Sequence, residues 1–411
     1  MRVETKFSPI DSFIGNSTSP VLTRSRACPI CGHFKDDSVL TFDDFQFFSD
    51  SPTAPKRCLL RISQCRHCQA VYLNPSFTTA GLNCLFEEAG QSYGSTETHR
   101  LEQVGWLGER GLLDINSSVL DVGCYDGAFL ALLPEGIRRI GVDIDDVAVA
   151  RGNELYGKQG IEIIQGAFES FVCPERLDLI TMFHVLEHLA NPLEVLVNLR
   201  SLSHDCTRLV VEVPLLENGL TNDINGFFSA QHMTHFSHST IAELFARAGW
   251  DILERFQISD YNGHRLLAQP GVPSEHVQGS GRDRTLVYRY LTHWFKSLQT
   301  IAAKIDPLQS YSKMVIWGSG IHTEYLYQKS PLFIQNPERQ YLIVDSDPLK
   351  QGRTWRGINI VSPDIIRSVE WDDTVLLISS YGGQESIALA ACELEVPDAS
   401  IVKLYDAVCR Y

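Results

Sequence analysis

Four of the eleven cysteines form two Cys-x-x-Cys pairs near the start of the chain. Cys28 and Cys31 make the first pair, and Cys65 and Cys68 the second. Zinc binds four thiolates in a tetrahedron, and a Cys-x-x-Cys turn can place two sulfurs on one ion. The pattern predicts a structural zinc ribbon, because four cysteines leave no coordination position for water. The alternative is a group of buried, reduced thiols.

A glycine turn follows the apolar segment 119–122. The sequence Val-Leu-Asp-Val-Gly-Cys-Tyr-Asp-Gly at 119–127 predicts a buried strand and a tight turn, with an apolar helix after them. Glycine lets backbone amides approach a ligand because it has no Cβ. Asp126 stands where the dinucleotide-binding pattern has its third glycine, so a pyrophosphate would meet an acid there. The turn therefore favours S-adenosylmethionine (SAM), a cofactor without phosphate, over NAD.

Residues after the next three predicted strands complete the expected cofactor site. Asp143 ends the second strand, where an acid can accept both ribose hydroxyls. His184 and His188 follow the fourth strand and are expected to line or brace the pocket, whereas Glu187 is expected to pack and to form hydrogen bonds. The predicted cofactor-binding residues are Asp121, Gly123, Tyr125, Gly127, Asp143, Ile144, Ala167, Phe168, Phe183 and His184.

Strands and helices must alternate to position these residues. Short apolar segments recur between 118 and 268 with helical segments between them, which implies a parallel sheet with helices on both faces. A stretch rich in Pro, Gly and Ser follows at 269–284, and an amphipathic helix is expected from about 284 to 305. Three more strands then begin at about 313, 341 and 374. The fold class is therefore α/β, with a second, smaller Rossmann-like unit at the C-terminus.

Composition narrows the class of protein further. The chain has 35 Lys and Arg against 50 Asp and Glu, a net charge of −15, which argues against binding nucleic acid. An odd number of scattered cysteines favours a reducing compartment. No apolar run is long enough for a membrane helix, and the N-terminus does not resemble a signal peptide. We expect a cytoplasmic protein with no membrane partner.

The motifs resemble those of class I SAM-dependent methyltransferases. Asp-Val-Gly-Cys-Tyr-Asp-Gly at 121–127, Gly-Val-Asp-Ile at 141–144 and His-Val-Leu-Glu-His-Leu-Ala-Asn-Pro at 184–192 resemble three of their motifs in the right order. With the cysteine pairs, the whole layout resembles the zinc-containing sugar C-methyltransferases, which act on keto-deoxysugars attached to nucleoside diphosphates. The composition and periodicity of the chain set the bounds of six segments. They are a flexible arm (1–25), a zinc-binding ribbon (26–78), a helical connector (79–117), a SAM-dependent methyltransferase domain (118–268), a linker (269–284) and a C-terminal Rossmann-like domain (285–411).

The same resemblance suggests catalytic residues. In the segment Gln-His-Met-Thr-His-Phe-Ser at 231–237, His232 matches the histidine that serves the family as base, whereas Gln231 replaces its Glu. Tyr93 lies where the family has a tyrosine near the substrate, and His235 is a further candidate. Methylation of carbon independently requires removal of a proton next to a carbonyl, for which an imidazole titrating near neutrality is suited. The expected partner is a small-molecule acceptor, and the resemblance suggests a nucleotide-linked sugar.

Several alternatives remain open at this stage. A base at His232 is equally compatible with O- or N-methylation of another small metabolite, in a natural-product or cell-surface glycan pathway. A non-catalytic zinc-bearing binding module would require the cofactor motifs to be relics. An NAD-dependent oxidoreductase would use the turn at Gly318 and Gly320, which lacks the third glycine of the dinucleotide pattern. We expect the C-terminal unit instead to wall one side of the substrate cleft, with that turn, Lys350 and Arg353 available to a nucleotide diphosphate.

Overall fold

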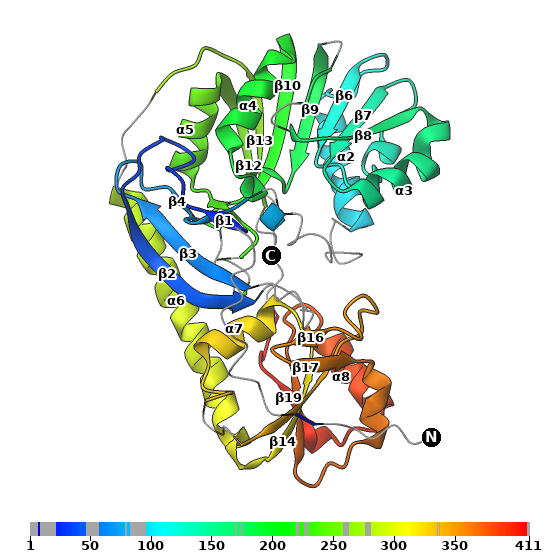
Figure 1. Ribbon diagram of the computed structural model, residues 1–411. Coiled ribbons are helices and arrows are strands. Elements are labelled where there is room, and N and C mark those ends of the chain that lie inside the picture. The colour runs from blue at the N-terminus through cyan, green and yellow to red at the C-terminus, as the bar shows by residue number, and fades with distance from the viewer. Residues whose placement is uncertain are drawn as a thin grey trace.

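The computed structural model has two lobes joined along one side (Figure 1). Helix α6 (Gly281–Ile305) and the antiparallel strands β2 (Asp36–Gln46) and β3 (Arg57–Cys65) run between the lobes. Tyr93 lies outside the described residues. The structure describes residues 7–8, 22–46, 57–78, 80–82, 96–168, 171–173, 176–218, 222–225, 228, 230–257, 263–275, 281–334, 336 and 338–408.

The first lobe is built on a seven-stranded sheet. Its spatial order is β12-β13-β10-β9-β6-β7-β8. The strands are β6 (Ser118–Val122), β7 (Arg138–Asp143), β8 (Ile161–Gln165), β9 (Leu177–Phe183), β10 (Ser203–Pro214), β12 (Trp250–Gln257) and β13 (Gly263–Pro270). The prediction of a parallel sheet is correct for β6 to β10 but wrong for β13, which is antiparallel to both of its neighbours. The chain leaves β12 and returns at once beside it, and such a direct return forces the second strand to reverse.

Helices cover both faces of this sheet because its buried strands are apolar on both sides. In β6, Val119 packs in one core with Trp106 and Leu107, while Leu120 packs in the opposite core. Helices α2 and α3 contribute to the first core, and α4 and α5 to the second. The helices are α2 (Glu97–Glu109), α3 (Asp146–Tyr156), α4 (Pro192–Ser201) and α5 (His238–Ala248).

The prediction of an apolar helix after the glycine turn is wrong. Only a short 3-10 turn, Leu130–Leu132, forms there. Pro134 restricts the residue before it to extended backbone, and Leu133 is extended with ψ of 147°. Gly136 then adopts the left-handed conformation, with φ of +92°. The segment therefore passes directly into β7.

A smaller sheet, called the cysteine-bearing sheet because Cys65 ends its strand β3, takes one strand from the first lobe. Its order is β11-β4-β3-β2, with β4 at Val71–Leu73 and β11 at Thr234–His235. Thr234 pairs with Tyr72, and His235 with Val71. The segment that carries His232 and His235 is therefore held by the cysteine-bearing sheet.

Parts of the predicted flexible arm are held in place by strand pairing. Ser8 exchanges two backbone hydrogen bonds with Tyr341, of 2.9 and 2.8 Å. Strand β1 (Thr23–Arg24) pairs with β5 (Ser76–Phe77). These described parts of residues 1–25 differ from the expected loose chain, because their backbone groups are hydrogen-bonded to strands.

The second lobe contains a six-stranded sheet of order β16-β17-β15-β14-β18-β19. Every pair is parallel except β16 with β17. The helix predicted from about 284 is α6, which begins at Gly281. The remaining elements are β14 (Lys313–Trp317), α7 (Ile321–Lys329), β15 (Gln340–Val344), β16 (Thr354–Trp355), β17 (Ile358–Val361), β18 (Thr374–Ile378), α8 (Gln384–Glu393) and β19 (Ile401–Lys403).

The second lobe shares one hydrophobic core with α6 and the cysteine-bearing sheet. At the edge, the buried Arg356 contacts Glu324 of its own lobe at 2.5 Å, and a second contact of 3.3 Å to the exposed Asp44 joins it to β2. Within the described part of the chain, none of the helices has the length and apolar character that a membrane crossing requires.

Candidate active site

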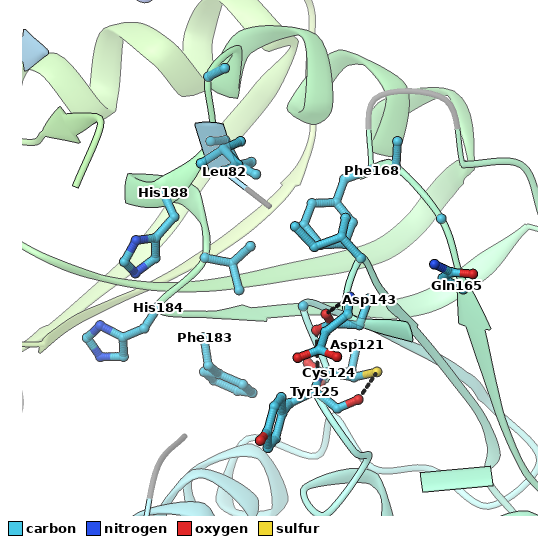
Figure 2. Close-up of a pocket in the computed structure, with 18 of the residues that line it drawn as sticks. Leu82, Asp121, Cys124, Tyr125, Asp143, Gln165, Phe168, Phe183, His184 and His188 are labelled. Atoms are coloured by element: carbon cyan, nitrogen blue, oxygen red, sulfur yellow. Dashed lines mark hydrogen bonds between the residues drawn. The ribbon is translucent and has the colours of Figure 1, made fainter. Parts of the chain in front are cut away.

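A cavity of about 960 Å³ opens at the carboxyl ends of the first lobe's parallel strands. The strand order reverses between β6 and β9, and open α/β sheets bind ligands at such a switch point. Figure 2 shows His184 and His188 on one side of this cavity and Asp143 and Gln165 on the other. The cavity is therefore where this topology places a ligand.

Nine of the ten predicted cofactor residues line this cavity. They are Asp121, Gly123, Tyr125, Asp143, Ile144, Ala167, Phe168, Phe183 and His184. The tenth, Gly127, is not in the cavity wall. A Cβ there would lie 2.6 Å from Cδ1 of Ile163, so Gly127 permits close packing against β8 and not ligand contact.

Asp143 holds the glycine turn in place from the neighbouring strand. Its Oδ2 accepts a hydrogen bond of 2.7 Å from the backbone N–H of Tyr125, and its Oδ1 accepts one of 2.9 Å from Asp145. Tyr125 has φ of +53°, which is unfavourable for any residue but glycine. Burial raises the pKa of Asp143, and these backbone hydrogen bonds oppose the rise. Asp143 thus fixes the turn as well as facing the cavity.

Asp121 is a second buried acid in the cavity wall. Its Oδ1 accepts a hydrogen bond of 2.7 Å from the Thr181 hydroxyl. Burial raises the pKa of Asp121 to about 7, with a smaller contribution from the charge of Asp143, while the Thr181 hydrogen bond opposes the rise. This end of the cavity can therefore carry concentrated negative charge when a cationic ligand is present.

Helix α2 supplies cavity residues that the sequence did not single out. Arg100 and Gln103, one helical turn apart, both line the cavity. Gln103 is almost fully buried, and its Nε2 has no hydrogen-bond partner among the described residues. A buried amide donor without a partner is costly unless a ligand accepts its hydrogen bond. The i,i+3 spacing of polar residues on a helix just before the first strand is the signal that could have found them.

The two predicted catalytic histidines, His232 and His235, are not among the described residues that line the cavity. The ring centroids of His232 and His188 are 4.9 Å apart, and His188 lines the cavity. Burial, followed by the charges of neighbouring histidines, lowers the pKa of His232 well below its ordinary value. The expectation of an imidazole titrating near neutrality is therefore not met. His235 lies farther in, its pKa lowered by burial to about 3, with its ring against Phe228.

A charged cluster at the ends of β9 and β10 was missed by the sequence analysis. Glu212 is fully buried in β10, and its Oε2 accepts hydrogen bonds of 2.9 and 2.7 Å from Arg265. Its Oε1 lies 2.8 Å from His99 Nε2 and 3.1 Å from His184 Nε2. Burial opposes the ionisation of Glu212, but its histidine and arginine partners lower its pKa below the ordinary value. A single acid within the apolar run Leu-Val-Val-Glu-Val was the available signal.

The four paired cysteines come together at one end of the small sheet, where Cys65 ends β3. The Sγ atoms of Cys28 and Cys68 are 3.5 Å apart, and those of Cys31 and Cys65 are 3.6 Å apart. A tetrahedral zinc ion with Zn–S bonds of about 2.3 Å separates its sulfurs by about 3.8 Å. The donor set and its spacing therefore fit zinc.

Comparison with known proteins gives the class of the first lobe. Residues 96–255 match the family model described as a methyltransferase domain. The match covers α2 and ends within β12. Together with the strand order and the cavity, it defines this part of the chain as a class I SAM-dependent methyltransferase domain.

Individual relatives are similar to parts of the chain only. A ubiquinone biosynthesis O-methyltransferase of Klebsiella pneumoniae is 29% identical over 119 residues, covering 27% of this chain and 46% of that protein. One from Pseudomonas fluorescens is 32% identical over 99 residues, covering 23% and 42%. The chain thus spans less than half the length of either relative. A solved SAM-dependent methyltransferase from Clostridium acetobutylicum has a TM-score of 0.38 at 9% identity, covering 46% of this chain and 98% of that one.

Proposed function

We propose that the protein transfers a methyl group from SAM to a small-molecule acceptor, most specifically to carbon of a nucleotide-linked keto-deoxysugar. The observation on which this proposal rests is the cavity at the switch point of the methyltransferase domain, with acids and a glycine turn at one end. Arg24 and Arg100 also line the cavity. Their positive charge suits an acceptor that carries phosphate.

The residues present fit SAM at the acidic end of the cavity. Asp143 would accept the ribose hydroxyls, Ala167 and Phe168 would lie against the adenine, and Gly123 leaves room for close backbone approach. A Cβ on Gly123 would lie 2.3 Å from Val185 Cγ2, so the turn depends on glycine. SAM supplies an electrophilic methyl group carried by a sulfonium. The acids near the turn suit that positive charge.

His232 is the proposed base for carbon methylation. Removing a proton next to a carbonyl leaves negative charge on the carbonyl oxygen, and the proton passes to a neutral imidazole. The buried setting keeps His232 neutral over the physiological range. His188 Nδ1 donates a hydrogen bond of 3.0 Å to the backbone oxygen of Gln231, which fixes the segment that holds His232 beside the cavity wall.

Cys28, Cys31, Cys65 and Cys68 are proposed as a structural zinc site. Because the sheet includes β11, zinc would also stabilise the segment that carries His232. The metal would have no part in the chemistry, since all four of its ligands would be protein thiolates.

O-methylation is the second candidate, favoured by the partial similarity to two ubiquinone biosynthesis O-methyltransferases. Incubation with SAM labelled with carbon-13 on the methyl group separates the two reactions. A methyl signal of a C–CH₃ group in the product supports the leading proposal, and a methoxy signal supports the second. Nucleotide-linked keto-deoxysugars and small molecules with a free hydroxyl group are the acceptors to compare. Absence of SAM binding in calorimetry would refute both.

A further inference from the structure

His184 is held between two carboxylates at the edge of the cavity. Its Nδ1 lies 3.1 Å from Glu187 Oε1, and its Nε2 lies 3.1 Å from Glu212 Oε1. Both ring nitrogens thus face carboxylate oxygens at hydrogen-bond distance. A neutral imidazole has one N–H, so one nitrogen lone pair would then point at an oxygen lone pair. The contacts require either a doubly protonated ring or a protonated glutamic acid.

Glu212 is not the group that holds an extra proton. Arg265 donates two hydrogen bonds to its Oε2, and His99 Nε2 lies 2.8 Å from its Oε1. A carboxylate surrounded by donors on both oxygens is held in its ionised form. Burial acts to lower the pKa of His184, but Glu187 and Glu212 outweigh it and raise that pKa to about 10.

Of His184, Glu187 and Glu212, only the imidazole of His184 reaches the cavity. The His184 side chain is 28% exposed, whereas those of Glu187 and Glu212 are 1% and 0% exposed. Figure 2 shows His184 across the cavity from Asp143. His184 also has φ of +55°, a strained conformation for a residue other than glycine, and its N–H donates to Glu212 O at 2.9 Å. Strain of this kind is kept where it serves a site.

We propose that His184 is a fixed imidazolium, positioned by Glu187 and Glu212, which favours acceptors that develop negative charge on an oxygen at or next to the atom that is methylated. This inference rests on the proposed methyl transfer. When the acceptor loses a proton to the base, the electron pair moves onto its oxygen, and a cation already in place stabilises that charge without reorganisation. His184 itself exchanges no proton in the step. Glu187 and Glu212 are positioning residues that keep its ring charged.

The charged and titratable groups around the ring come from four elements and from the segment before β11. Glu187 and His188 lie on the turn after β9, Glu212 on β10, His99 and Glu102 on α2, and Arg265 on β13, with His232 behind His188. Glu102 contacts Arg265 at 2.7 Å from the outer side. This arrangement gives a matched pair of variants, since Glu212 contacts His184 and Glu102 contacts only the outer side of the same arginine.

The test measures the protonation state of His184 in the intact protein without ligand. Nitrogen-15 NMR of labelled histidine monitors that state from pH 6 to 9. The His184→Gln variant assigns the signal. We expect a doubly protonated ring up to at least pH 8, lost at that pH in Glu187→Gln and Glu212→Gln but kept in Glu102→Gln. A singly protonated ring at pH 7 in the parent would overturn the proposal, because Glu187 would then hold the proton.

A kinetic measurement tests the role of this charge. At saturating SAM, Glu187→Gln should lower kcat about 10²-fold, the scale for loss of one preorganised electrostatic group. Unchanged kcat, with the ring shown to be neutral, would overturn the role. If Glu212→Gln does not fold, Glu187→Gln alone decides, because it leaves the Arg265 pair intact. The protonation result stands without any acceptor, so failure of the proposed methyl transfer would be recognised separately.

Discussion

Asp121→Asn is expected to stabilise the methyltransferase domain at alkaline pH. The carboxyl group is buried at the end of β6 and accepts a hydrogen bond from Thr181, which asparagine can also accept through its oxygen. Burial raises the pKa of Asp121 to about 7 from an ordinary 3.8. The folded protein therefore keeps this proton over a range in which the unfolded chain releases it.

The sign and size of the effect follow from this difference in proton binding. Between the two pKa values the folded state binds more protons, so stability falls as pH rises through that window. One pKa unit corresponds to about 1.4 kcal/mol. At pH 8, above both pKa values, the ionisable Asp121 therefore lowers the free energy of unfolding by about 4 kcal/mol. The asparagine variant does not ionise. Its advantage over the parent should grow by about 3 kcal/mol between pH 5 and pH 8.

Hydrogen exchange of the amides in Ser118–Val122 measures the local stability of this strand. A local measurement is needed because the chain has several cores that can unfold separately. Asp178→Asn is the control, because Ser118 and His204 hold the pKa of Asp178 below its ordinary value although burial opposes them. That variant should lose protection above the unfolded pKa of the acid. An advantage of Asp121→Asn that is the same at pH 5 and pH 8 would refute the reasoning.

Three further predictions concern the zinc, cofactor and base assignments. Protein purified without added zinc should contain about one equivalent by metal analysis, and Cys65→Ser should lose both metal and thermal stability, whereas the exposed Cys206→Ser should lose neither; a stable, metal-free parent would contradict the site. Asp143→Ala should weaken SAM binding in calorimetry by about 1.5–3 kcal/mol, the scale for hydrogen bonds to a charged group, and NAD should not bind to the parent; unchanged SAM affinity would place the ribose elsewhere. His232→Ala should lower turnover by about 10²–10⁴-fold with SAM affinity nearly intact. Because burial lowers the pKa of His232 well below its ordinary value, the parent's turnover should not fall between pH 8 and pH 6, and should fall only at more acidic pH; a loss centred near pH 6.5 would contradict this environment.

Local features of the sequence predicted the strands well. Each apolar segment expected between Val119 and Val213 is a strand, and the cavity lies at the carboxyl ends of these strands, because parallel strands bring such residues to one edge. The prediction of a helix after Gly127 was wrong, because Pro134 and Gly136 end the helical conformation there. Both residues were visible in the sequence.

Contacts between distant segments could not be predicted in this way. Nothing near Thr234 indicates that it pairs with Tyr72, since strand partners depend on the assembled fold. The contacts of Glu212 with His99 and Arg265 likewise join three separate elements. A single sequence can show that an acid in an apolar strand needs a partner, but not which residue provides it.

Strand β11 has a consequence for how such proteins can be recombined. A chimera that exchanges residues 26–78 between relatives, or a truncation that removes them, cuts through a sheet and not through a linker, because β11 comes from the other module. Without β11, β4 would present an unpaired edge with the buried side chains of Val71 and Leu73, and such edges promote aggregation. The two regions should therefore be inherited, exchanged and expressed together, and a crossover placed after Ala248 would preserve every pair in this small sheet.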